Sequence, residues 1–254
     1  MALEPFALTR VESSRLARSL TSGSAGRLSA HLAGPDDDAA LLSLQVTATV
    51  FSESFGNTPQ LLRREYADLL PSMNHLVVLD RVAQAPVGAL ILQEGAAATL
   101  KTVVDLAAPP WSLMALPALG LSPEDRNAAD LLVMAVDGAF RNRGIAQLLM
   151  YAGWVASVAR GIDRWTAILD DGLLRGLDQL TGSAVVPIGS ARSAPYLGSP
   201  GSTPVTVRMN PSVDGELLSR MQRVGRLAER TTTFCPRLEP DRVAFQSLAL
   251  PVAA

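Results

Sequence analysis

Between Asp130 and Arg160 the sequence reads DLLVMAVDGAFRNRGIAQLLMYAGWVASVAR, and the rest of the chain can be placed around this stretch. Residues 131–136 form a near-continuous apolar run, which is typical of a strand buried on both faces. A turn of mixed composition follows at residues 137–143. Apolar residues then recur every three or four positions from Ile145 to Ala159, which predicts an amphipathic helix of about four turns. The stretch therefore predicts a strand, a turn and a helix in succession.

The turn before this helix is a candidate anion site. A helix start carries unpaired N–H groups and the positive end of the helix dipole. Gly144 and Ala146 leave the backbone uncovered there, and Arg141 and Arg143 add two positive charges, so a phosphate or pyrophosphate would fit. A purely structural role, with Gly and Arg serving packing and solubility, fits the spacing as well.

Two familiar phosphate-binding loops do not fit the same turn. Gly138 and Gly144 have five residues between them and no Lys follows Gly144, so the P-loop pattern fails. The dinucleotide-binding fingerprint needs three glycines at its own spacing, and they are absent from the sequence.

The turn does resemble the acetyl-CoA-binding motif of the GNAT superfamily of N-acyltransferases. In that family an apolar Val ends the strand, an Arg or Gln lies five positions later, and a Gly and a Gly or Ala follow at fixed spacing. Here Val136 ends the strand, Arg141 follows, and Gly144 and Ala146 complete the pattern. Gly138 stands where the family often has Pro, and either residue suits a turn.

This resemblance implies a fold, a co-substrate and a set of binding residues. The fold is an α/β domain whose mixed, mostly antiparallel central sheet is flanked by helices. The co-substrate is acetyl-CoA or another acyl-CoA, with no metal. In the family the loop N–H groups hold the CoA pyrophosphate, and the end of the strand pairs with the pantetheine arm. The residues implied here are Met134, Ala135, Val136, Arg141, Asn142, Arg143, Gly144, Ile145 and Ala146.

The remaining elements follow in the order expected of that fold. We expect a strand at 26–33, helices at 39–56 and 58–70, a hairpin of 75–80 with 87–92, and a strand at 164–169 followed by a helix to 180. Strands at 184–188 and 203–209 close the sheet, with a turn-rich loop between them. This gives an N-terminal extension (1–25), a GNAT-like domain (26–209) with an insertion (93–129), and a C-terminal helical extension (210–254), in which we expect a helix at 211–230.

The insertion at 93–129 has two possible roles. The minimal fold needs only a short turn there, and a long connection in a compact domain is usually functional or has its own structure. One role is a lid or wall of the acyl or acceptor pocket, formed by Trp111, Leu113, Met114 and Leu116. The other is a surface subdomain or a dimer contact.

The usual proton donor of the family has no clear counterpart here. Family members often carry an Asn after the 164–169 strand and a Tyr in the next helix, which protonate the departing thiolate. Asp170 and Asp171 lie near the Asn position, and Leu177 occupies the Tyr position. Tyr196 is the substitute candidate for a proton donor or substrate contact, although it could instead anchor its loop on the sheet. A thiolate leaves readily, so the acid is not obligatory.

The carboxylates near the motif strand are the obvious pool for the general base. Asp137 lies at the mouth of the turn, where it could equally pair with Arg141 or cap the helix, and Glu53 lies near the end of the first long helix. Together with these two, the pool contains Glu65, Asp80 and Glu94. No pair of His, Cys or carboxylate residues has metal-ligand spacing.

Composition limits the functional classes. The chain has 254 residues, 48% of them hydrophobic, enough for one generous core with an appended subdomain. A net charge of −2 and a pI near 5.7 argue against nucleic acid and anionic membrane partners. Cys235 is the sole cysteine, and no apolar run reaches membrane-span length, so we expect a cytoplasmic protein. Arg-rich, Lys-poor composition favours a high-GC bacterial source.

Three functions are compatible with this sequence. The first is transfer of an acyl group from acyl-CoA to a small-molecule or peptide amine by direct attack. The second resembles the N-acyl amino acid synthase and autoinducer synthase branch, which takes longer chains from acyl carrier protein and would need a deep apolar channel. The third is a non-catalytic CoA-binding sensor or interaction module, which the missing Asn and Tyr favour. A homodimer is compatible with all three.

Overall fold

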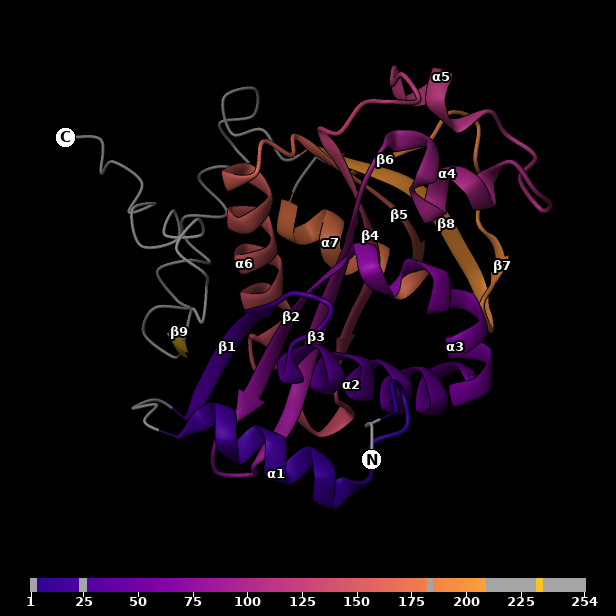
Figure 1. Ribbon diagram of the computed structural model, residues 1–254. Coiled ribbons are helices and arrows are strands. Elements are labelled where there is room, and N and C mark those ends of the chain that lie inside the picture. The colour runs from indigo at the N-terminus through magenta and orange to yellow at the C-terminus, as the bar shows by residue number, and fades with distance from the viewer. Residues whose placement is uncertain (1–3, 23–26, 182–184, 209–231, 235–254) are drawn as a thin grey trace.

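The computed structural model describes residues 4–22, 27–181, 185–208 and 232–234 (Figure 1). They form a nine-stranded sheet in the order β6-β8-β5-β4-β3-β2-β1-β9, with β7 paired to β8. The pairings β4–β5 and β1–β9 are parallel and the other six are antiparallel, so the predicted mixed, mostly antiparallel sheet is confirmed. The strands are β1 (Leu28–Ala33), β2 (Met73–Asp80), β3 (Ala85–Glu94), β4 (Ala128–Val136), β5 (Arg164–Asp170), β6 (Val185–Pro187), β7 (Ala194–Tyr196), β8 (Ser199–Arg208) and β9 (Thr232–Phe234).

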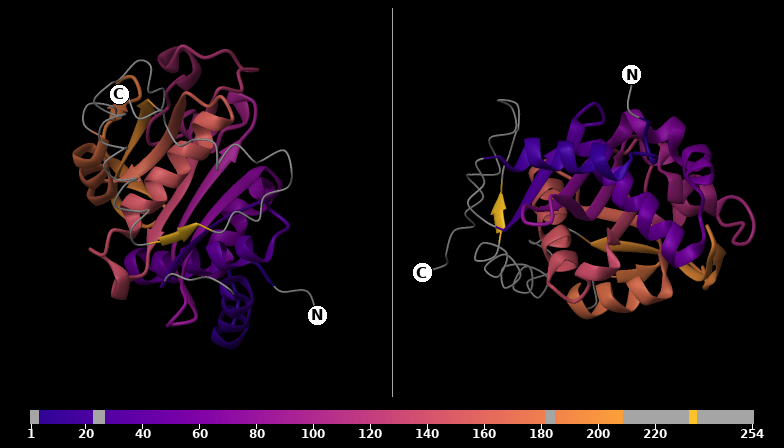
Figure 2. Two further views of the ribbon diagram at one scale, coloured as in Figure 1. Left: turned by 90° about the vertical axis from the view of Figure 1, so that its left-hand side faces the viewer. Right: turned by 90° about the horizontal axis from the view of Figure 1, so that it is seen from below.

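Helices cover both faces of this sheet (Figure 2). The α-helices are α1 (Arg10–Thr21), α2 (Asp38–Phe55), α3 (Pro59–Tyr66), α4 (Lys101–Leu106), α5 (Ala115–Leu119), α6 (Ile145–Ala159) and α7 (Asp171–Thr181), and the 3-10 helices are η1 (Ala67–Ser72), η2 (Ala97–Thr99) and η3 (Gly138–Phe140). On β3, Leu90 and Leu92 belong to the core that contains α6, whereas Ala89 and Ile91 belong to the core that contains α2. Because successive side chains of a strand point to opposite faces, α2 and α6 lie on opposite sides of the sheet.

The strand, turn and helix predicted at 130–160 are confirmed as β4, η3 and α6. Two glycines let α6 approach the sheet closely. A Cβ atom on Gly88 of β3 would lie 2.6 Å from Cγ2 of Ile145, and a Cβ atom on Gly153 would lie 3.1 Å from Cη2 of Trp165. The first residue of α6 is therefore held directly against β3.

Two predicted segments differ from the structure. The α-helix predicted to reach residue 70 ends at Tyr66, and the chain continues as η1, which contains Pro71. The predicted turn-rich loop between the closing strands contains a hairpin, β7 with the start of β8, in which Tyr196 pairs with Ser199. Leu197 and Gly198 have φ angles of 45° and 83°, the left-handed conformation that tight hairpins require.

The segments outside the predicted domain also contribute elements. Helix α1 begins with a capping box, in which the amide of Thr9 donates to Glu12 Oε2 at 2.8 Å and the amide of Glu12 donates to Thr9 Oγ1 at 3.3 Å. Phe6 is buried and stacks on Tyr66 at 6.2 Å between ring centroids. The helix predicted at 211–230 lies outside the described residues, and β9 pairs with β1 at the edge of the sheet.

Candidate functional site

The site lies where two adjacent parallel strands separate. Pairing of β4 with β5 covers three residue pairs, from Ala128 with Arg164 to Asp130 with Thr166. Beyond this point β4 stays paired with β3 as far as Val136, and β5 stays paired with β8 as far as Asp170. We call the point of separation the fork. Residues of both strands line a cavity of about 580 Å³ beyond it.

The walls of this cavity are mainly apolar and come from both faces of the sheet. Helix α2, strands β4 and β5 and helix α7 all contribute. The apolar lining includes Val50, Phe51, Phe55, Leu132, Met134, Val136, Leu169, Leu173 and Leu177. The polar lining includes Ser54, Arg141, Asn142, Asp170, Tyr196 and Ser199. Such a pocket, apolar with a few converging polar groups, is typical of a small-molecule site.

A buried carboxylate fixes the fork. Asp130 is fully buried in the last residue pair before the strands part. It accepts hydrogen bonds from the amide of Thr102 at 2.5 Å, from Thr102 Oγ1 at 2.7 Å and from Thr166 Oγ1 at 3.1 Å. Burial, which disfavours the charged form, raises the pKa of Asp130 to about 6. Helix α4 of the insertion is thereby fastened to the fork.

The turn before α6 lies at one end of the cavity. Asn142 and Gly144 both have left-handed backbone conformations, with φ angles of 61° and 80°. Gly144 is the N-cap of α6 and offers no side chain to the first amides of the helix. The guanidinium of Arg141 donates to Val136 O at 3.4 Å and to Ser54 Oγ at 3.3 Å. Free helix amides beside a guanidinium suit a bound phosphate.

Most residues predicted to bind CoA line this one cavity. Eight of the nine do so, namely Met134, Ala135, Val136, Arg141, Asn142, Gly144, Ile145 and Ala146. The ninth, Arg143, lies over the ring of Phe140, with its guanidinium carbon 5.3 Å from the ring centroid.

The three predicted catalytic residues lie in different settings. Tyr196 lines the cavity. Asp137 accepts a hydrogen bond from the amide of Ala139 at 2.8 Å and so caps η3. Glu53 is exposed on α2. Neither Asp137 nor Glu53 is among the residues that line the cavity.

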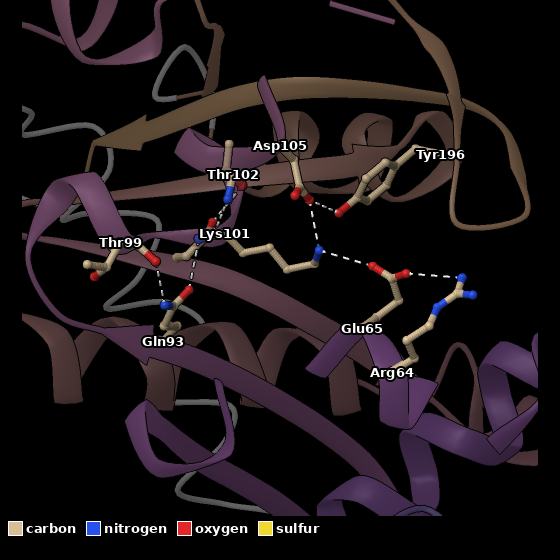
Figure 3. Close-up of polar contacts among 9 residues, drawn as sticks. Arg64, Glu65, Gln93, Thr99, Lys101, Thr102, Asp105 and Tyr196 are labelled. Carbon is tan, nitrogen blue, oxygen red and sulfur yellow. Dashed lines mark hydrogen bonds and ion pairs between the residues drawn. The ribbon is translucent and has the colours of Figure 1, made fainter. Parts of the chain in front are cut away.

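Tyr196 belongs to a polar cluster that the sequence did not reveal (Figure 3). Its hydroxyl donates to Asp105 Oδ2 at 2.5 Å. The Lys101 ammonium donates to the same oxygen at 2.9 Å and lies 3.4 Å from Glu65 Oε2. Burial, followed by the nearby negative charge of Asp105, raises the pKa of Tyr196 well above its ordinary value. The one local signal for this cluster was the spacing of Lys101 and Asp105, which places them on one face of a helix.

Trp111 of the insertion packs against the ring of Tyr196. The indole N–H of Trp111 donates to Arg192 O at 2.8 Å, and its ring centroid lies 5.7 Å from that of Tyr196. Leu113 and Leu116 pack on a small core that the insertion forms together with Ile188 and Ala191. Met114, the fourth residue predicted to form a wall, is 80% exposed.

The positions where the family often has Asn and Tyr also lie at the cavity. Asp170 accepts hydrogen bonds from Ser199 Oγ and from the amide of Gly172, both at 2.8 Å. Leu177 is buried against the main core and lines the cavity.

In the part of the chain that the structure describes, no helix is both long and apolar enough to cross a membrane. Over the same residues, no three His, Cys, Asp or Glu side chains are grouped to hold a metal ion.

Comparisons with known proteins support the fold. No protein-family model matches the sequence, and no curated protein matches it. Among solved structures, BjaI, a CoA-dependent acyl-homoserine lactone synthase with bound SAM and isopentyl-CoA, has a TM-score of 0.52 and 17% identity over 82% of this chain and 94% of its own. FeeM, an N-acyl amino acid synthase from uncultured soil microbes, has a TM-score of 0.54 and 12% identity over 72% of this chain and 93% of its own. The predicted GNAT-like fold is confirmed by these similarities.

Proposed function

We propose that this GNAT-fold protein is an N-acyltransferase that moves an acyl group from acyl-CoA to an amine. The observation that carries the proposal is a single cavity lined both by the turn before α6 and by the part of β4 that is no longer paired with β5. Residues 131–136 of β4, the turn and the start of α6 all line this cavity. The CoA pyrophosphate would bind the turn, and the pantetheine arm would pair with β4 along the side that β5 has left.

The reaction would be direct attack of the amine on the thioester carbon. A C–N bond forms, the C–S bond breaks, and CoA leaves as a thiolate, which is a good leaving group at neutral pH. Backbone N–H groups of β4 beyond the fork could donate to the thioester oxygen as negative charge develops on it. Positioning of the two substrates would contribute most of the rate enhancement.

The acceptor would enter from the face of the sheet that α2 and α3 cover. On this face the cavity is lined by Phe51 and Phe55 of α2, Tyr66 of α3, and Tyr196 and Leu197 of the hairpin. The turn leads into α6, which covers the opposite face, so the two substrates would approach the cavity from different sides. A small-molecule or peptide amine with an apolar body suits such a lining.

A second candidate is a synthase that uses longer acyl chains, with acyl carrier protein as a possible donor. A volume of about 580 Å³ and the apolar side chains of Leu169, Leu173 and Leu177 favour it, since an acetyl group alone would fill little of this space. BjaI and FeeM, whose names describe acyl-homoserine lactone and N-acyl amino acid synthesis, add support for this branch.

Calorimetric binding of CoA, acetyl-CoA and octanoyl-CoA tests the donor site. Gly144→Glu places a carboxylate at the phosphate turn, where an added Cβ would meet no other atom, and should weaken binding by repulsion. Gly161→Glu is the matched control, because Gly161 lies just beyond the other end of α6, is also left-handed at φ 74°, and also has open space. Loss of binding in Gly144→Glu alone supports the proposal.

The preferred chain length then separates the two candidates. Tighter binding of octanoyl-CoA favours the long-chain synthase, whereas equal binding favours an acetyltransferase. If the wild-type protein binds none of the three ligands, the CoA site is wrong. If it binds them but releases no CoA thiol with any amine, the protein is a CoA-binding module and not a transferase.

A further inference from the structure

The cluster beside Tyr196 has the geometry of a proton relay that starts at the cavity. Tyr196 lines the cavity, while Asp105 lies behind it on α4. Because the Tyr196 hydroxyl donates its own hydrogen to Asp105 Oδ2, its oxygen lone pairs remain to accept a hydrogen bond from a bound substrate. A donor in the cavity would therefore be connected to Asp105 through a single hydroxyl group.

Asp105 lies among several charged and titratable groups. Lys101 contacts both Asp105 and Glu65, and its side chain is only 11% exposed. The ionisable groups that face Asp105 come from four elements: Lys101 from α4, Glu65 and Tyr66 from α3, Asp130 from β4 and Tyr196 from β7. One ammonium is thus set among three carboxyl groups, and Asp105 Oδ2 accepts hydrogen bonds from both this ammonium and the Tyr196 hydroxyl.

We propose that Tyr196 accepts a proton from the acceptor's ammonium group and passes its own phenolic proton to Asp105. Tyr196 would be the catalytic residue, whereas Asp105 and Lys101 would be positioning residues that act through it. This inference rests on the proposed acyl transfer, and it names the base of that reaction. It assigns the role to Tyr196, supported by Asp105 and Lys101 of the insertion, and to none of the carboxylates in the predicted pool.

The reaction starts from a protonated amine bound beside Tyr196. One N–H bond of the ammonium breaks and its proton binds the Tyr196 oxygen, while the Tyr196 O–H bond breaks and its proton binds Asp105. The neutral amine attacks the thioester carbon, so the C–N bond forms and the C–S bond breaks. A second proton on nitrogen moves to the departing sulfur, giving the amide, CoA thiol and a neutral Asp105. Asp105 then releases its proton to solvent.

The environment of Tyr196 favours a relay over a simple acid. Burial raises the pKa of this phenol, and a CoA thiol is already more acidic than an ordinary phenol, so the thiolate would gain little from Tyr196 as a donor. The same raised pKa disfavours a free phenolate. Uptake of one proton and release of the other would therefore occur together.

The test compares two acceptors that differ in basicity but not in their aromatic group. Benzylamine is protonated at pH 7.5, whereas O-benzylhydroxylamine is neutral and needs no deprotonation before attack. The measurement is the rate of CoA thiol release from the tightest-binding acyl-CoA. Tyr196→Phe should lower kcat about 100-fold or more with benzylamine, and by less than about fivefold with O-benzylhydroxylamine. Asp105→Asn should show the same discrimination.

Two controls separate a relay from a structural role. Tyr151→Phe makes the same change on α6, away from the cavity lining, and Asp68→Asn makes the matching change at an exposed position on η1. Neither should alter the ratio of the two rates. Raising the pH supplies neutral benzylamine and should restore the Tyr196→Phe enzyme toward the wild-type rate, which a packing defect would not allow.

Three results would overturn the relay. Equal loss with both amines would indicate a structural role for Tyr196, and no loss with either would show that its hydroxyl is not used. If the wild-type protein released CoA with neither amine, Tyr196 would be rejected as a base for simple amines. In that last case, retained calorimetric binding of acyl-CoA shows that the donor site stands, and absent binding shows that the proposed function has failed as well.

Discussion

Replacing Gly88 with alanine tests how closely the turn before α6 is held against the sheet. The new Cβ atom would lie 2.6 Å from Ile145 Cγ2 and 3.2 Å from Leu149 Cδ1. Carbon atoms prefer about 3.5–4.0 Å, so the start of α6 must move by about 1 Å. Ile145 is buried at 1% exposure and is β-branched, which leaves it few alternative rotamers. Overpacking of this kind costs about 1–3 kcal/mol.

Urea unfolding and CoA calorimetry measure the two consequences of Gly88→Ala. The free energy of unfolding should fall by about 1–3 kcal/mol. CoA should also bind about tenfold more weakly, because Ile145 is the first residue of α6 and a lost 1.4 kcal/mol corresponds to a factor of ten. Under the proposed function the affinity falls because the amides that would face the pyrophosphate move with Ile145.

A second glycine supplies the control for the unfolding measurement. Gly176 lies within α7, and a Cβ atom added there would meet no other atom within 4 Å. Gly176→Ala should therefore raise the free energy of unfolding by about 0.5–1 kcal/mol, as alanine replaces glycine in a helix. If Gly88→Ala unfolded at the wild-type urea concentration and bound CoA normally, the close contact between α6 and β3 would be refuted.

Three further predictions concern other buried groups, each measured by urea unfolding. Folding raises the pKa of Asp130 from 3.8 to about 6, so its contribution to stability is full below about pH 4 and is lost as the pH rises through about 6. Relative to Asp130→Asn, the wild type should lose about 3 kcal/mol of unfolding free energy between pH 4 and pH 7. Burial lowers the pKa of His75 from 6.5 to about 4, so its contribution to stability is full above pH 6.5 and is lost as the pH falls through 4. His75→Gln should therefore remove about 3 kcal/mol of the fall in unfolding free energy that the wild type shows over that range. Phe6→Ala should cost about 3–5 kcal/mol because its ring is buried against Tyr66, and an unchanged midpoint would show that the N-terminal segment does not contribute to the core.

The elements that the sequence predicted best are those with local signals. The apolar run of β4 and the three- and four-residue spacing in α6 depend only on near neighbours in the chain. The turn between them could be matched to a motif because its residues are consecutive. The β7–β8 hairpin was missed because its turn is Leu197-Gly198, without the Asn-Gly or Asp-Gly signal, and because Pro195 and Pro200 lie beside it in the strands.

The fork and the polar cluster depend on contacts between distant residues. Strands β4 and β5 separate at Asp130, which accepts hydrogen bonds from Thr102 and Thr166, 28 and 36 positions away in the sequence. Tyr196 and Asp105 are 91 positions apart. Spacing within one sequence carries no signal for such contacts, so the sequence predicted Tyr196 as a candidate without its partner.

Pairing of β9 with β1 has a consequence for the order of synthesis. Strand β1 begins at Leu28, and residues 232–234 pair with its first three residues, Leu28 to Ala30, along the outer edge. A ribosome adds about 5–20 residues per second, so β1 can pair with β2 long before β9 has been made. Until then the outer edge of β1 presents free N–H and C=O groups, which can pair with a strand of another chain. This part of the edge is therefore covered only once residues 232–234 have been made and have paired with β1.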